Sequence, residues 1–237
     1  MSKVITLVKS NGLAPAEFRE YWREEWLKSL LEESEVTDNL ARVVHNHVLP
    51  TQAREGEPDE IDQWAGVAEF WYYDKPSAQR YIDSESVKRV MASHFEKVPE
   101  VSHLHVYEIA GWERKSHQTA MKLLGLFKPP KGMARENALA YWKDNHLQVT
   151  ARLGMSQKLF KYVQNHCFED AMASDDKHNF CGGPEMWIES QEEAQSIFAD
   201  QALLSELRMD EAEFADPLQS FLLVLEEEEV FTYKADS

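Results

Sequence analysis

The stretch Phe18-Arg-Glu-Tyr21-Trp22 decides the fold, because the chain repeats it about 120 residues later as Leu139-Ala-Tyr141-Trp142. The match extends upstream and downstream of both segments in the same order and with small gaps. The further matching pairs are Leu7-Val8-Lys9 and Gly12 with Leu126-Phe127-Lys128 and Gly132, Asn46-His47 with Asn165-His166, Gly66 to Trp71 with Gly182 to Trp187, and Ala78-Gln79 with Ala194-Gln195. Five blocks in one order indicate an internal duplication.

Each copy is predicted to form a strand, a helix, two strands, a second helix and a fourth strand. Pro15 suits the first turn of a helix, and in the second copy an apolar stripe at helical spacing runs from Leu139 to Leu153. The predicted strands are 4–9, 43–48, 66–73 and 103–109 in the first copy and 121–128, 160–168, 185–188 and 220–225 in the second, with second helices beginning near Ser77 and Glu192.

A βαββαβ unit covers one sheet face with helices and leaves the other face bare, so two units can bury their bare faces together. We therefore expect an α+β fold in which two ferredoxin-like βαββαβ repeats, residues 1–112 and 119–237, form one intramolecular α+β barrel. The polar stretch within 111–120 is predicted to be a linker. The long acidic loops 51–62 and 169–179 favour lids or binding loops, and Glu226 to Glu229 indicate a solvated strand end or tail.

The composition excludes several classes of partner. Forty-two acidic residues against 25 basic ones give a net charge of -17, which repels nucleic acid and anionic membranes. The apolar run Val4 to Val8 is too short for a signal peptide, and no segment approaches the roughly 20 apolar residues of a membrane span. We therefore expect a cytoplasmic protein. Cys167 and Cys181 are predicted to be buried free thiols, although a disulfide between them is open.

Polar residues in the second copy suggest a site. His146 lies on the apolar helix stripe, where it could act as a general base or be a core histidine bonded to a carbonyl. Strand alternation places Tyr162, Gln164 and His166 on one face and Asn165 on the other, and either face could look toward the helices. Buried polar side chains need partners, which a ligand or a strand edge would supply.

Two further patterns leave alternatives open. His45 and His47 share a strand face, as do His103 and His105, and with Glu69 they could bind a metal. Glu69 and Glu185 occupy matching positions in aromatic strands, where an inward carboxyl group would have a raised pKa. Structural salt bridging is the favoured interpretation for at least one of the two.

The chain resembles the EthD-like branch of the dimeric α+β barrel superfamily. The resemblance lies in a strand ending in Lys, then Gly, then Tyr-Trp-x-x-x-His, and a strand carrying Asn-His. The second copy carries this pattern throughout, with Lys128, Gly132, Tyr141, Trp142, His146, Tyr162, Asn165 and His166. The first copy has Trp26 where the family pattern has His. The resemblance implies a pocket between sheet and helices, and hydrophobic, often aromatic or lactone-like, substrates handled without a cofactor.

From these observations we predict a cofactor-independent lyase or isomerase, similar to a decarboxylase or dehydratase, that acts on an aromatic or polyketide-like molecule. His146 is the predicted base, with His166 and Tyr162 orienting or protonating. The predicted substrate contacts are Tyr141, Trp142, Gln164, Asn165, Glu185, Trp187, His47 and His45. A binding protein without turnover and an oxygenase, cofactor-free or metal-dependent, are the alternatives, and a homodimer of tandem barrels is left open.

Overall fold

Eight antiparallel strands close a barrel in the order β1-β3-β2-β8-β5-β7-β6-β4. The computed structural model describes residues 1–49, 64–115, 119–169 and 179–232, with side chains as far as Glu228. The strands are β1 (Ser2–Lys9), β2 (Leu40–Val48), β3 (Trp64–Tyr72), β4 (Glu100–Glu113), β5 (Met121–Leu126), β6 (Lys161–Cys167), β7 (Gly182–Ile188) and β8 (Phe221–Thr232).

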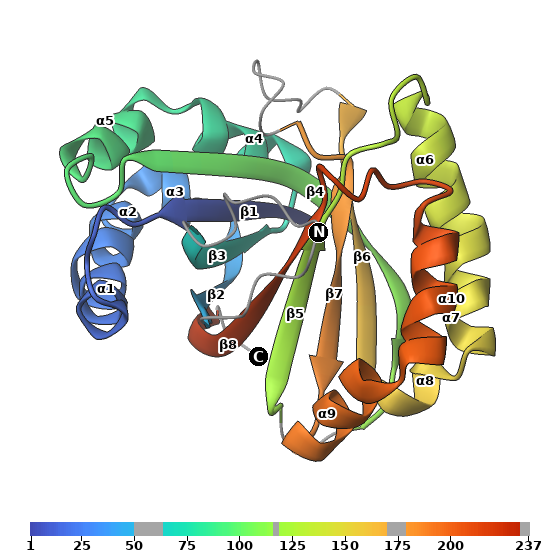
Figure 1. The fold of residues 1–237 in the computed structure, drawn as a ribbon. Coiled ribbons are helices and arrows are strands. Elements are labelled where there is room, and N and C mark those ends of the chain that lie inside the picture. The colour runs from blue at the N-terminus through green and yellow to red at the C-terminus, as the bar shows by residue number, and fades with distance from the viewer. Residues whose placement is uncertain (50–63, 116–118, 170–178, 233–237) are drawn as a thin grey trace.

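Helices cover the barrel in two layers, one from each half of the chain, on opposite sides of the strands (Figure 1). The first layer consists of α1 (Pro15–Tyr21), the π-helical segment η1 (Trp22–Leu27), α2 (Lys28–Leu31), α3 (Ser34–Thr37), α4 (Lys75–Asp83) and α5 (Glu85–Ser93). The second consists of α6 (Arg135–Tyr141), the π-helical segment η3 (Trp142–His146), α7 (Leu147–Arg152), α8 (Met155–Lys158), α9 (Gln191–Ala199) and α10 (Gln201–Glu211).

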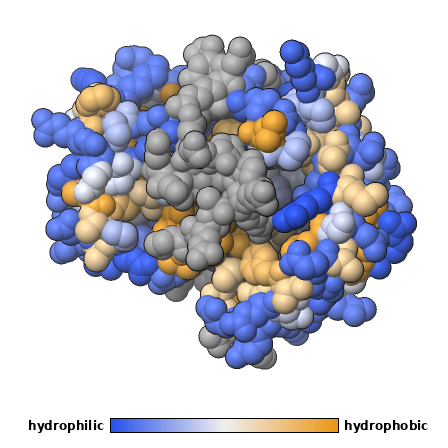
Figure 2. Space-filling view, in the orientation of Figure 1, coloured by the Kyte–Doolittle hydropathy of each residue, from blue (hydrophilic) through white to orange (hydrophobic). Residues whose placement is uncertain are grey.

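Most residues of β1, β2, β3, β6 and β7 are buried, so these strands are covered on both faces. All eight residues of β1 are buried. Its Ile5 and Leu7 point into the barrel and pack with Val67, Leu124 and other strand residues, while Val4 and Val8 pack under the first helical layer. The visible outer surface is largely hydrophilic over both helical layers (Figure 2), as the high content of charged residues leads one to expect.

The order of elements within each half is strand, helices, two strands, helices and strand, as predicted. The halves join along two seams, where β2 pairs with β8 and β4 pairs with β6. Both cysteines are buried free thiols, as expected. The predicted loop 51–62 lies outside the described residues, as does all of 169–179 except its ends, so their predicted role as lids stays a prediction.

Two boundaries were wrong. β4 continues to Glu113, so the predicted linker loses its first three residues to a strand that pairs with β6. β8 runs to Thr232 rather than ending at Leu225, so the acidic run that begins at Glu226 is part of a strand, as one of the two alternatives had it, and not a tail. It pairs with β2 to close the barrel. The run looked like a tail because three consecutive glutamates each have a partner elsewhere in the fold: Glu226 pairs with Arg19, Glu227 with Lys122 and Glu228 with His47.

Candidate functional site

The helical layer of the second half brings together most of the predicted site residues. Two of them, Trp142 and His146, lie on η3, which interrupts the α-helix between α6 and α7, and Tyr162, Gln164 and His166 lie on β6. A π-helical turn bonds i to i+5 and widens the helix, and such turns occur frequently at functional sites. Trp142 and His146, at the two ends of η3, are both buried, and Trp142 stacks on His166 of β6 while His146 packs on Phe214. The first half has a π-helical segment, η1, at the corresponding place.

His146 is held by a carboxylate. Its Nδ1 lies 2.5 Å from Oδ2 of Asp210 on α10, and the hydroxyl of Tyr141 donates to Oδ1 of the same residue at 2.9 Å. A carboxylate can only accept, so the hydrogen lies on Nδ1 of His146. Burial lowers the pKa of His146, and Asp210 offsets this only in part. The imidazole is therefore neutral at pH 7 and keeps a lone pair on Nε2.

The face of β6 that carries Tyr162, Gln164 and His166 looks toward the helices, which the sequence had left open. The Tyr162 hydroxyl accepts from Nε1 of Trp142 at 3.3 Å, and Gln164 Nε2 donates to the Trp142 carbonyl at 2.9 Å. His166 bonds Gln164 at 3.1 Å and stacks between Trp142 and Tyr107. Burial, with a smaller contribution from Lys143, lowers the pKa of His166 to about 4. His166 is thus a neutral ring in an aromatic stack.

Asn165 and Glu185 lie on the opposite side of the sheet, inside the barrel. There Glu185 accepts from Nζ of Lys3 at 2.6 Å and from Nδ2 of Asn165 at 3.1 Å. Lys122 pairs with Glu185 at 2.8 Å and with Glu69 at 2.7 Å. Lys3, Lys122, Glu69 and Glu185, which we call the interior charge cluster, are all buried within the barrel. Both carboxyl groups form salt bridges, which confirms the favoured interpretation.

The two carboxyl groups of the interior charge cluster differ in pKa. Burial and the neighbouring Glu185 raise the pKa of Glu69 to about 8. Burial also acts to raise the pKa of Glu185, but Lys122 and Lys3 outweigh it and hold that pKa well below its usual range. Glu185 accepts from more donors than Glu69, which explains why Glu185 is the ionised member. The pair therefore carries one proton at neutral pH.

Two tryptophans close the barrel end beside this cluster. Trp187 lies between Lys122 and Lys161, each 4.9 Å from its ring centroid, and donates to Glu227 at 3.2 Å. Trp71 lies in the same way between Lys3 and Arg42 and donates to Glu108 at 3.1 Å. Cations on both faces of a ring gain cation–π attraction. This end of the barrel is thus built from paired charges and aromatic rings. Trp187 belongs to it and is not part of the group around His146.

The first half places His45 and His47 under its own helical layer, where His45 stacks on Trp22 and His47 contacts Glu228 of β8 at 3.3 Å. These two histidines are therefore not part of the His146 group. His103 and His105 lie on β4, which β1 and β3 separate from β2 in the sheet. Across the described residues, no group of three or more His, Cys, Asp or Glu side chains is arranged to hold a metal ion.

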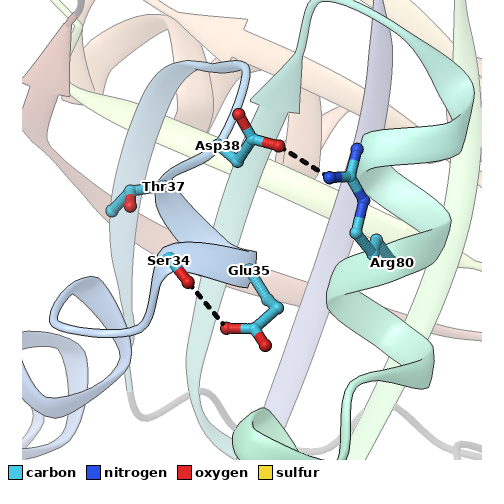
Figure 3. A pocket seen from close by; sticks show the side chains of 5 residues that line it. All are labelled: Ser34, Glu35, Thr37, Asp38 and Arg80. Atoms are coloured by element: carbon cyan, nitrogen blue, oxygen red, sulfur yellow. Dashed lines mark hydrogen bonds and ion pairs between the residues drawn. The ribbon is translucent and has the colours of Figure 1, made fainter.

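A surface hollow of about 400 Å³ lies between α3 and α4. It is lined by Ser34, Glu35, Thr37, Asp38 and Arg80 (Figure 3). Arg80 is paired with Asp38 at 2.6 Å and Ser34 donates to Glu35 at 3.0 Å. Because its charged groups are exposed and already paired, the hollow offers no poised acid or base.

Among the described residues, no helix is long and apolar enough to cross a membrane.

Sequence reasoning missed Asp210, Lys3 and Lys122. Asp210 follows Leu203 and Leu207 on the buried face of α10, and a carboxylate on an apolar helix face was a readable signal. The two lysines occupy matching positions in the first strands of the two copies, inside otherwise apolar sequence. A duplicated lysine in a buried strand was the signal for the interior charge cluster.

Residues 130–218 match the EthD domain. They contain the whole helical layer of the second half, including His146, Asp210 and β6. No curated protein matches the chain.

Solved structures share the fold. An anthrone oxidase-like protein matches with a TM-score of 0.60 at 11% identity, over 96% of this chain and 92% of that one. A candidate monooxygenase from Fusobacterium nucleatum matches with a TM-score of 0.53 at 6% identity, over 99% and 98% of the two chains. At these identities the likeness concerns the fold alone.

Proposed function

We propose that the protein is an enzyme that removes and returns a proton on a hydrophobic carbon acid, as a cofactor-independent lyase or isomerase, with His146 as its general base. The observation that carries this proposal is the 2.5 Å contact between His146 Nδ1 and Asp210. A carboxylate that orients an imidazole and stabilises its protonated form is a recurrent arrangement for base catalysis. The match of this region to the EthD domain supports placing the site here.

The proposed chemistry balances within the site. Nε2 of His146 takes a proton from a carbon next to a carbonyl group, and the electron pair passes into the carbonyl to give an enolate. Asp210 stabilises the imidazolium that forms. Return of the proton to another carbon completes an isomerisation, and its transfer to a departing hydroxyl group releases water. The low dielectric of a buried site strengthens the attraction between Asp210 and the imidazolium.

The remaining residues receive narrower roles than the sequence suggested. Tyr141 orients Asp210. Tyr162 holds the indole ring of Trp142 and Gln164 holds its backbone carbonyl group. We propose Tyr162 as a positioning residue, because its hydroxyl is already engaged and its pKa is raised by burial. His166 and Trp142 would supply the aromatic wall. Asn165, Glu185 and Trp187 belong to the barrel interior and are not assigned to this site.

We further propose that the two halves are tandem EthD-like ferredoxin repeats, residues 1–112 and 119–237. The repeated order of elements and the matching pairs inside the barrel, Lys3 with Lys122 and Glu69 with Glu185, support this. The EthD match is confined to the second half, which agrees with the presence of Trp26 in the first half where the family pattern has His.

Anthrone is a suitable first probe, because its methylene protons are acidified by a carbonyl group and two rings and because a protein of this fold is described as anthrone oxidase-like. Exchange of these protons for deuterium in D2O, followed by NMR, measures the proposed step without a known product. His146→Gln should slow exchange by about 10²- to 10⁴-fold, the usual contribution of a general base. The rate should rise with pH through a pKa below 6.5 and then level off.

His94→Gln is the matched control, because His94 occupies in the first half the position of Asp210 and bonds Tyr21 as Asp210 bonds Tyr141. It should leave exchange unchanged. Full exchange in His146→Gln would remove His146 as the base. Anthrone that binds but is recovered unexchanged would instead favour the binding protein, and oxidation to anthraquinone after exchange would favour a cofactor-free oxygenase, for which the same base suffices.

A further inference from the structure

The helical layer of the first half contains a cluster of buried polar atoms that no described residue bonds. Among the described residues, Nε1 of Trp22, Nε1 of Trp26, both ring nitrogens of His45 and Nδ1 of His47 are buried without a hydrogen-bond partner. The four side chains are in contact. Trp22 stacks on Trp26 at 4.1 Å and on His45 at 4.8 Å between ring centroids, and His45 lies 6.3 Å from His47. We call these four residues the first-half polar cluster.

The second half shows that the fold does not require these atoms to lack partners. At the corresponding positions, Trp142 Nε1 donates to Tyr162, His146 bonds Asp210, and Gln164 donates to the Trp142 carbonyl. His166, which corresponds to His47, bonds Gln164. Native proteins pair almost all buried polar groups with protein, water or ligand. The first half therefore presents hydrogen-bonding capacity that its described side chains do not use.

We propose that the first-half polar cluster is a second binding site, for a neutral molecule that carries a phenol or enol hydroxyl group. The chemistry of the donors selects this class. An indole N–H can only donate, so Trp22 and Trp26 require an acceptor oxygen. A neutral imidazole offers one accepting nitrogen, so His45 can receive the hydroxyl hydrogen. A single hydroxyl group satisfies both demands at once.

The charge of the surroundings excludes an ionised ligand. Burial, with smaller contributions from His47 and Arg23, lowers the pKa of His45 to about 3, so this ring stays neutral and supplies no countercharge. Arg19 is already paired with Glu226 at 2.6 Å. An ion buried without a partner is strongly disfavoured. A phenol should therefore bind in preference to a carboxylate of the same size.

Aromatic rings form the wall beside these polar atoms. Phe18 stacks on Trp22 at 5.6 Å, and Gly66 of β3 lies directly beneath the indole, where an added Cβ would come within 2.9 Å of Trp22 Cε2. Glycine at this position lets the indole lie flat against the sheet. The cluster thus joins an apolar ring surface to hydroxyl-binding atoms, which is the combination that a phenol ring requires.

The test is a titration of the full-length protein with 4-fluorophenol, followed by 19F NMR, with 4-fluorobenzoate as the charged probe of similar size. We expect 4-fluorophenol to bind and 4-fluorobenzoate to bind at least tenfold more weakly. Trp26→Phe removes one N–H and keeps an aromatic ring, and it should weaken phenol binding about fivefold to tenfold, as loss of one hydrogen bond does. Thermal unfolding of each variant checks that it is folded.

His45→Gln places in the first half the residue type that the second half has at the corresponding position, Gln164. The new amide should donate to the Trp22 carbonyl as Gln164 does to that of Trp142, which should raise the Tm and weaken phenol binding at least tenfold. His146→Gln should leave this binding unchanged, which separates the proposal from the general-base site. Equal affinity for the two probes, unchanged affinity in both first-half variants, loss of binding in His146→Gln alone, or the absence of phenol binding to the wild-type protein would each overturn it.

Discussion

The two halves of the molecule agree inside the barrel and differ under their helices. Inside, Lys3 corresponds to Lys122 and Glu69 to Glu185, and each lysine contacts the carboxylates of both halves. Under the helices, by contrast, Trp26 stands where the second half has His146. A buried charge cannot change alone without leaving its partner unpaired. Under the helices, the buried pair of His146 and Asp210 lies within the second half alone, so the presence of Trp26 in the first half leaves neither member of that pair unpaired.

The largest effect should come from removing one buried cation. Lys122 contacts Glu69, Glu185 and Glu227 at 2.7 to 3.0 Å, so Lys122→Met should lower the free energy of unfolding by about 3–5 kcal/mol. Lys3→Met should cost less, because Lys3 has one contact at 2.6 Å and two beyond 3.2 Å. Urea unfolding measures both. Lys88→Met, at an exposed pair with Glu85, is the control and should change stability by less than about 0.5 kcal/mol.

If Lys3→Met and Lys122→Met proved equally destabilising, the two halves would be energetically equivalent inside the barrel despite their different distances. If neither variant cost more than the Lys88 control, the interior charge cluster would not contribute to stability.

The proton on Glu69 leads us to predict a second, smaller effect, on the pH dependence of stability. The pKa of Glu69 is raised to about 8 in the fold, so the folded protein holds this proton between pH 4.5 and 8 while the unfolded chain releases it. The stability that Glu69 contributes is present at low pH and lost as pH rises through 8. Histidines with lowered pKa have the opposite effect, because stability falls as the pH falls below 6.5. They are His45, His103 and His166. Stability should therefore peak near pH 6.5.

Between pH 6.5 and 8 the fall in the free energy of unfolding should have a slope of up to about 1.4 kcal/mol per pH unit. Glu69→Gln keeps the hydrogen-bonding shape without the titration, so its stability should not fall in this window. Chemical unfolding at a series of pH values checks this. The same slope in wild type and Glu69→Gln would place the proton elsewhere.

Sequence periodicity predicted the strands because short apolar runs closed by turn residues mark them in both halves. Alternation also grouped Tyr162, Gln164 and His166 correctly, since side chains of a strand point to opposite faces in turn. Which face meets the helices depends on how the sheet closes, and no local pattern carries that information.

The partners of the site residues were the part that sequence could not supply. Asp210 lies 64 residues from His146, and only the packing of α10 against η3 joins them. The π-helical turn that contains His146 was not predicted from the sequence. Lys3 was placed outside its strand, because a lysine looks like a surface residue until the carboxylates of another strand are seen beside it.

The smallest predicted effect compares the two seams. Beside the β2–β8 seam, Arg19 of α1 forms an exposed pair with Glu226 of β8 at 2.6 Å, whereas across the β4–β6 seam Tyr107 stacks on His166 at 5.4 Å. Arg19→Ala should cost less than about 1 kcal/mol, and the cost should vanish in high salt because exposed pairs are screened. Tyr107→Ala should cost about 1–2 kcal/mol at any salt concentration, because ring burial and stacking are not screened. Urea unfolding at low and high NaCl separates the two, and a salt-dependent cost at Tyr107 would mean that charge rather than stacking holds that seam.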